Sequence, residues 1–137
     1  IHTPSSSKVY KEFNKMNLNS NLEIDPFNAR EFSETIITFL NSEVNNYKSI
    51  IIGGDLNIDR TYKNGIINFK NIEKNTDFVD VSWGLHKKRI FTHKNFQDDY
   101  FFLDKKTYNE KIKDMNILEY PDNLASDHEP IFIKLDI

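Results

Sequence analysis

Apolar residues recur at helical spacing in the first third of the chain. Between Ala29 and about Tyr47 they fall every three or four positions, with glutamates between them. The apolar positions are Phe32, Ile36, Phe39, Leu40, Val44 and Tyr47. Because this period places them on one face, the pattern predicts an amphipathic helix with one buried stripe.

The remaining apolar segments favour strands. A short, β-branched apolar run over 49–52 predicts a strand buried on both faces, and Gly53 and Gly54 end it. Residues 59–77 are expected to form a loop and a short helix, and 131–137 alternate apolar and polar residues as a half-buried strand does. Further strands are predicted at 90–92, 100–103 and 112–118. This mixture predicts a layered α/β fold.

Composition narrows the class of protein. The 137 residues suffice for one domain, and no apolar run approaches the roughly 18 residues that a membrane span needs. The net charge of -3 excludes a strongly basic chain that binds polyanions by its overall field. Cysteine is absent from the sequence, which excludes disulfides and thiolate chemistry. That absence slightly favours the cytoplasm and leaves the compartment otherwise open.

The apolar run ends in Gly-Asp-x-Asn, where chemistry can sit. Asp55 and Asn57 are two positions apart, so in extended geometry both side chains point the same way from one strand end. A carboxylate there can hold a water, a metal or a proton, and an amide can bind a phosphoryl oxygen without adding charge. The alternative is an ordinary turn, in which Gly, Asp and Asn are all common.

Three other segments carry candidate groups. Asp127 and His128 precede the last strand and can present a carboxylate and an imidazole to one site. Asp98 and Asp99 precede a buried strand, where neighbouring carboxylates are costly without a partner or a cation. Solvated loops and turn caps are the alternatives for both pairs. His2 by itself indicates no site, and it becomes a candidate site residue only together with the motifs that follow it.

Together these motifs resemble the endonuclease/exonuclease/phosphatase superfamily, the fold of deoxyribonuclease I, exonuclease III, bacterial sphingomyelinases and inositol phosphatases. They stand in the family's order: Ile1-His2-Thr3, Gly54-Asp55-Leu56-Asn57, Thr92, Asp99-Tyr100 and Ser126-Asp127-His128-Glu129-Pro130. In one departure, Gln97-Asp98 stands where the family has arginine followed by isoleucine or leucine. The second acid there either repels substrate phosphate or helps to bind a cation.

The resemblance implies half of a four-layer α/β/β/α sandwich of the deoxyribonuclease I type. Residues 1–137 would be the C-terminal part of a single domain. The family's early asparagine and its metal-binding glutamate cannot be placed in the chain. We therefore expect either that the chain is a fragment of a longer protein or that the N-terminal half of the same fold is a separate piece, and we expect activity to require that half.

The activity implied by the resemblance is metal-dependent hydrolysis of phosphodiester bonds. Asp55 would orient or deprotonate the attacking water, and Asn57 would hydrogen-bond a phosphoryl oxygen. His128 would act on the same phosphate as a hydrogen-bond donor or proton shuttle. The Asp55→Asn change is expected to remove activity and leave folding intact.

The remaining implied roles concern orientation, the leaving group and the metal. Asp99 would orient a catalytic histidine that the sequence alone does not identify. His2 would stand near the leaving group. Asp127 would bind a divalent cation, Mg²⁺ by preference and Mn²⁺ as the alternative, since such a site uses oxygen ligands and retains waters.

The substrate is less determined by the sequence. A nuclease is the first choice, because Lys87, Lys88 and Arg89 could contact a nucleic-acid backbone, although a solvated loop is the commoner explanation of such residues. The second choice is a lipid or inositol phosphate phosphodiesterase, since Gly-Gly-Asp-Leu-Asn also resembles sphingomyelinases. Four phenylalanines could form a membrane-edge hairpin or part of the core: Phe91, Phe96, Phe101 and Phe102. An inactive binding module of the same fold is the third choice, and the oligomeric state stays open.

Overall fold

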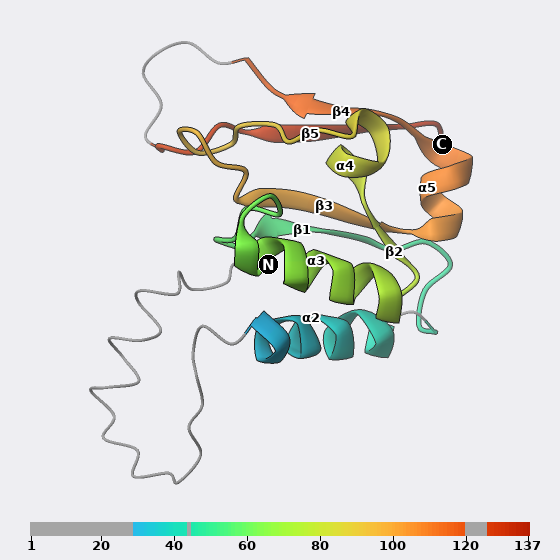
Figure 1. Cartoon of the computed structure of the whole chain (residues 1–137). Helices are drawn as coiled ribbons and strands as arrows, with labels where there is room; N and C mark the ends of the chain where they lie inside the picture. Colours follow the sequence, from blue (N-terminus) through green and yellow to red (C-terminus); the bar gives the residue numbers. More distant parts are fainter. Residues whose placement is uncertain (1–28, 44, 120–125) are drawn as a thin grey trace, which may run out of the picture.

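The computed structural model describes residues 29–43, 45–119 and 126–137 (Figure 1). Its elements are α2 (Ala29–Glu43), β1 (Ile51–Asp55), α3 (Lys63–Asn75), β2 (Phe78–Asp80), α4 (Val81–His86), β3 (Asp99–Asp104), α5 (Lys105–Lys111), β4 (Ile112–Ile117) and β5 (Ile131–Leu135). His2 lies outside the described residues. Among the elements just named, none is a helix with the length and apolar character needed to cross a bilayer.

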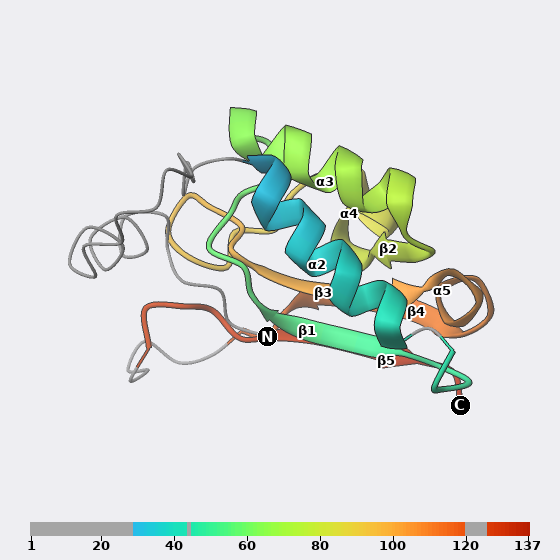
Figure 2. The same cartoon turned by 90° about the horizontal axis from the view of Figure 1, so that it is seen from below.

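The described chain forms three layers. Strands β1, β3 and β2 make an antiparallel sheet with β3 in the centre, and β4 pairs with β5 in a second antiparallel sheet. Helices α2 and α3 cover one face of the first sheet, and the second sheet lies beyond its other face (Figure 1). Seen from below, α2 runs across β1 and β3 (Figure 2). The mixed α/β class predicted from the sequence is confirmed.

Strand β3 contributes to two cores, because successive side chains of a strand point to opposite faces. Tyr100 and Phe102 are buried with residues from α2 and α3, whereas Leu103 is buried with Met115 of β4. The first core comprises Ile36, Leu40, Ile50, Leu56, Phe69, Ile72, Phe78, Tyr100 and Phe102. The second comprises Val81, Ile90, Leu103 and Met115. The central strand is therefore held from both sides, which fixes the position of its first residue, Asp99.

The predicted helix is confirmed, but its buried stripe is narrower than expected. Helix α2 ends at Glu43, so Tyr47 lies beyond it and is 64% exposed. Ile36 and Leu40 are buried, whereas Phe39 is 44% exposed. Residues four apart lie on one line of a helix, and Phe39 lies to the side of the line formed by Ile36 and Leu40.

The predicted strands need two corrections. The strand of the apolar run is not buried on both faces: β1 is an edge strand, and Ile51 is 45% exposed. Residues 90–92 form no strand. The N–H groups of Thr92 and His93 instead donate to the Phe96 carbonyl across a tight turn. The other three predicted strands appear as β3, β4 and β5, and the short helix expected within 59–77 is the 13-residue α3.

Gly53 allows the close approach expected of a glycine at this point. It pairs directly with Phe101 of β3, and a Cβ atom at Gly53 would lie 2.6 Å from the Phe101 ring. The space that the glycine leaves is therefore filled by an aromatic side chain of the neighbouring strand.

Candidate active site

Strand pairing brings two of the predicted carboxylates to the same edge of the sheet. Asp55 is the last residue of β1 and pairs directly with Asp99, the first residue of β3. The chain leaving β1 remains attached to β3, because Leu56 N–H donates to the Asp98 carbonyl at 2.8 Å. The two acids come from positions 44 apart in sequence, and only the antiparallel register makes them neighbours.

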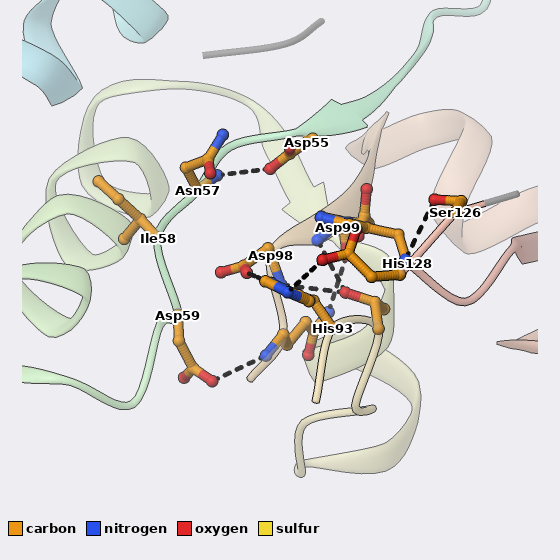
Figure 3. Close-up of polar contacts among 12 residues, drawn as sticks. Asp55, Asn57, Ile58, Asp59, His93, Asp98, Asp99, Ser126 and His128 are labelled. Atoms are coloured by element: carbon orange, nitrogen blue, oxygen red, sulfur yellow. Dashed lines mark hydrogen bonds and ion pairs between the residues drawn. The ribbon is translucent and has the colours of Figure 1, made fainter. Parts of the chain in front are cut away.

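Asn57 does not continue the strand, so the expected extended geometry from Asp55 to Asn57 is wrong. Its φ of 52° lies in the left-handed region, which asparagine tolerates better than most residues. Its N–H donates to Asp55 Oδ1 at 2.8 Å, and Figure 3 shows Asn57 beside Asp55 at the end of β1. The local structure is thus the turn considered as the alternative, but the turn lies within the site and orients the Asp55 carboxylate.

Asp99 contacts His128, the histidine partner that the sequence left unnamed. His128 Nδ1 lies 2.7 Å from Asp99 Oδ2, and His128 stands in the loop before β5 (Figure 3). A carboxylate only accepts hydrogen bonds, so Nδ1 carries the proton in this pair. The second ring nitrogen of His128, Nε2, is then left for another partner.

The site is negatively charged around His128. Partial burial lowers the pKa of His128, but the hydrogen bond and the charge of Asp99 outweigh this effect. The charges of Asp55 and Asp127 act in the same direction as Asp99, and the net result is a raised pKa of His128. The arrangement therefore favours the protonated imidazole, which can donate to an anionic group.

A second histidine–aspartate pair, absent from the sequence-based prediction, lies against the first. His93 Nδ1 lies 3.0 Å from Asp98 Oδ2, and its Nε2 lies 3.2 Å from Asp127 Oδ2. The rings of His93 and His128 stack with centroids 4.4 Å apart and planes within 11° of parallel (Figure 3). Burial raises the pKa of Asp98 despite the opposing hydrogen bond and charge of His93. The one feature of the sequence that pointed to this pair was Asp98, a carboxylate before a buried strand that was expected to need a partner.

Thr92 holds the two pairs in place. Its hydroxyl oxygen accepts the N–H groups of Asp98 and Asp99 at 3.0 and 3.1 Å, and its carbonyl accepts the N–H of Glu129 at 2.6 Å. The last bond ties the segment that carries His128 to the turn that carries Thr92. Within the segment, Ser126 Oγ accepts the N–H of His128 at 3.1 Å.

Replacing Thr92 by Val should lower the free energy of unfolding, because Thr92 is fully buried and two N–H groups would lose their acceptor. We expect a loss of about 1–3 kcal/mol for each N–H group left unsatisfied, measured by urea denaturation. Thr92→Ser keeps the oxygen and should lose much less. Equal urea midpoints for the Val variant and the parent would show that the hydroxyl does not organise this turn.

Gln97 and Arg89 serve the fold around the site. Gln97 is fully buried, and its side chain accepts the Ile90 N–H at 3.1 Å and donates to Ser82 Oγ at 2.8 Å. Arg89 donates to Asp59 Oδ2 at 2.9 Å, and the same oxygen accepts the Gln97 N–H. Partial burial raises the pKa of Asp59, but its hydrogen bonds outweigh this and lower it. Gln97, the residue at which the motif differs from that of the superfamily it resembles, thus has a structural role.

Two overlapping groups bring potential metal ligands together. Asp55, Asp99 and His128 form one, and His93, Asp127 and His128 form the other, with the ligand atoms of each group within 4.8 Å of one another. The Asp127 side chain is 72% exposed, whereas the Asp99 side chain is 18% exposed. An exposed carboxylate that leaves room for waters and phosphate oxygens fits the way Mg²⁺ binds in proteins.

The described structure thus collects four of the predicted site residues at one edge: Asp55, Asp99, Asp127 and His128. Asn57 lies beside Asp55 through the turn described above. His2 cannot be located, since it falls outside the described residues.

Comparison with known proteins finds a similar structure but no similar sequence. No protein-family model and no curated protein sequence matches the chain. The structure is similar to the catalytic domain of APE2 from Xenopus laevis, with a TM-score of 0.57 and 20% identity over 77% of this chain. The resemblance inferred from the motifs is therefore confirmed at the level of the fold. The chain spans 42% of that domain, which agrees with the expectation that part of the fold lies elsewhere.

Proposed function

We propose that the protein is a metal-dependent phosphodiesterase and that its substrate is nucleic acid. The observation that supports this most is the pairing of Asp55 with Asp99 across two strands, with Asp99 bound to His128 at 2.7 Å. A carboxylate and a carboxylate-supported imidazole at one sheet edge are the groups needed to activate a water and to meet the charge of a phosphate.

The proposed roles follow from the local geometry. Asp55, oriented by the Asn57 N–H, positions or deprotonates the water that attacks phosphorus. His128 donates from Nε2 to a phosphoryl oxygen as negative charge develops, and Asp99 keeps the opposite ring nitrogen protonated. The Asn57 amide hydrogen-bonds another phosphoryl oxygen.

A divalent cation held at the site would supply positive charge that this acidic chain lacks. Asp127 is the residue proposed to hold it, because its exposed carboxylate suits Mg²⁺, with Mn²⁺ as the alternative. When bound, the cation neutralises part of the negative charge of the phosphoryl group.

Exposed aromatic side chains near the turn favour nucleic acid over lipid. Tyr62 and Phe96 are both exposed, with ring centroids 5.4 Å apart, and Arg89 lies 5.1 Å from the centroid of the exposed Phe91 ring. Aromatic faces next to a cation are surfaces on which unpaired bases stack. Of the four phenylalanines considered for a membrane-edge hairpin, Phe102 is buried in the first core and is not part of such a surface. Lys87 and Lys88 remain exposed and available for backbone phosphates.

The test is hydrolysis by the complete protein, including the N-terminal half of the fold that we expect to be required. Supercoiled plasmid should be nicked in the presence of Mg²⁺, the nicking should stop with a chelator, and excess Mg²⁺ should restore it. Parallel assays follow phosphocholine release from sphingomyelin vesicles and phosphate release from inositol phosphates. Release in either lipid-type assay without nicking would replace nucleic acid as the substrate, and inactivity in all assays would favour a binding module.

A further inference from the structure

We propose that His93, Asp127 and His128 form a second cation site, for a borderline divalent ion such as Zn²⁺, and that its occupancy inhibits the proposed hydrolysis. Only the inhibitory effect rests on the proposed function. Binding of the ion stands on the geometry of the three side chains alone.

Each of the two imidazoles has a carboxylate at Nδ1, which leaves Nε2 as the nitrogen that can bind a metal. His93 Nδ1 lies 3.0 Å from Asp98, and His128 Nδ1 lies 2.7 Å from Asp99. Metal-binding histidines almost always donate their other ring N–H to such a partner, which fixes the tautomer and raises the basicity of the ligand nitrogen. Here the adjacent acids Asp98 and Asp99 each contact Nδ1 of one of the two stacked rings.

His93 Nε2 faces a carboxylate without forming a hydrogen bond to it. Within the described part of the chain, His93 Nε2 is buried and makes no hydrogen bond, although Asp127 Oδ2 lies 3.2 Å away. In a neutral ring whose proton is on Nδ1, Nε2 presents a lone pair, and so does the facing carboxylate oxygen. A cation between the two acceptors would satisfy both.

The ligand set distinguishes this ion from the proposed Mg²⁺. Two imidazole nitrogens and one carboxylate oxygen are the donors that Zn²⁺ and its neighbours accept, whereas Mg²⁺ is bound through oxygen. The ligand atoms lie within 4.8 Å of one another, close enough for small side-chain shifts to close around one ion. Three protein ligands leave a fourth position open.

Inhibition follows from the two shared residues. An ion on His128 Nε2 occupies the nitrogen from which His128 donates to the phosphate in the proposed mechanism. An ion on Asp127 competes with Mg²⁺ for the same carboxylate. The site would therefore couple the activity to the free concentration of a transition metal.

The direct test is a titration of the metal-free complete protein with Co²⁺, which reports coordination by its visible absorption, followed by displacement with Zn²⁺. The parent should show the bands of low-coordinate Co²⁺, and stoichiometric Zn²⁺ should remove them. His93→Phe keeps a ring against His128 and removes both nitrogens, so it should lose the bands. His86→Gln is the matched control, since His86 hydrogen-bonds the Met115 carbonyl away from the site and its loss should leave binding unchanged.

Asp98→Asn provides a second variant that keeps all three ligands and alters only the support of His93. Its Zn²⁺ affinity should fall by about ten- to a hundredfold. Zn²⁺ should also inhibit Mg²⁺-dependent hydrolysis in the parent at concentrations that fill the site, and inhibit His93→Phe much less. Equal Zn²⁺ binding by the parent and His93→Phe would overturn the site. Binding as expected in a protein that hydrolyses nothing would support the site and reject the proposed function instead.

Discussion

The Asp55→Asn protein is expected to fold like the parent and to hydrolyse phosphodiesters about a hundred to ten thousand times more slowly. The amide oxygen of asparagine can still accept the Asn57 N–H, which lies 2.8 Å from Asp55 Oδ1, so the turn after β1 should persist. The amide cannot take a proton from water or carry a negative charge. Initial rates of plasmid nicking in Mg²⁺, with circular dichroism as the check of folding, measure the effect.

Asp77→Asn is the control for this substitution. Asp77 is a solvent-exposed acid whose ion pair with Lys105 spans 3.9 Å, and it has no place in the proposed mechanism. Its loss should leave the nicking rate unchanged. If Asp55→Asn nicks plasmid as fast as the parent and Asp77→Asn, Asp55 does not activate the water.

The Asp99→Asn protein should also lose about two to four orders of magnitude in rate, because His128 loses the carboxylate that favours its protonated form, the form that donates from Nε2. The asparagine side chain is uncharged and its NH₂ group can turn toward Nδ1, so it favours the neutral imidazole, which brings no positive charge to the phosphate. The charge of Asp99 helps to raise the pKa of His128, so the pKa of His128 should fall in the variant. NMR titration of the imidazole measures that change independently of the rate.

The two readouts separate positioning from simple destabilisation. A variant that is merely less stable would lose activity through unfolding and would leave the His128 titration of its folded fraction unchanged. Asp104→Asn gives a structural comparison at the other end of β3, where the carboxylate accepts the Ile50 N–H at 2.7 Å. It should cost stability without shifting the titration of His128. A parental rate and an unshifted titration in Asp99→Asn would show that the 2.7 Å contact has no role in function.

Local regularities were sufficient to predict most elements. Helix α2 and strand β5 follow hydrophobic periods of 3.6 and 2 residues, which depend on neighbours within a few positions. The failures occur where local signals compete with tertiary contacts. The predicted strand at 90–92 is an example: Thr92 instead hydrogen-bonds to Phe96 across a turn, and its hydroxyl accepts the N–H groups of Asp98 and Asp99.

The sequence was also sufficient to name several residues that the structure brings together, since each motif adjoins an apolar strand and carries its own chemistry. It was not sufficient for their partners. His93 stands in a turn without an apolar neighbour pattern, and its role depends on Asp127, which lies 34 positions later and 3.2 Å away. No local pattern encodes that distance.

The sequence by itself determined which groups the protein has and that they stand beside strands of an α/β fold: carboxylates at 55, 99 and 127 and an imidazole at 128. Only the tertiary structure decided that Asp99 serves His128, that Asp98 serves His93, and that the two rings stack. The physical reason is that a side chain's chemistry and its local period belong to the residue and its neighbours. Pairing across a site belongs to the strand register and to the loops that return from distant parts of the chain.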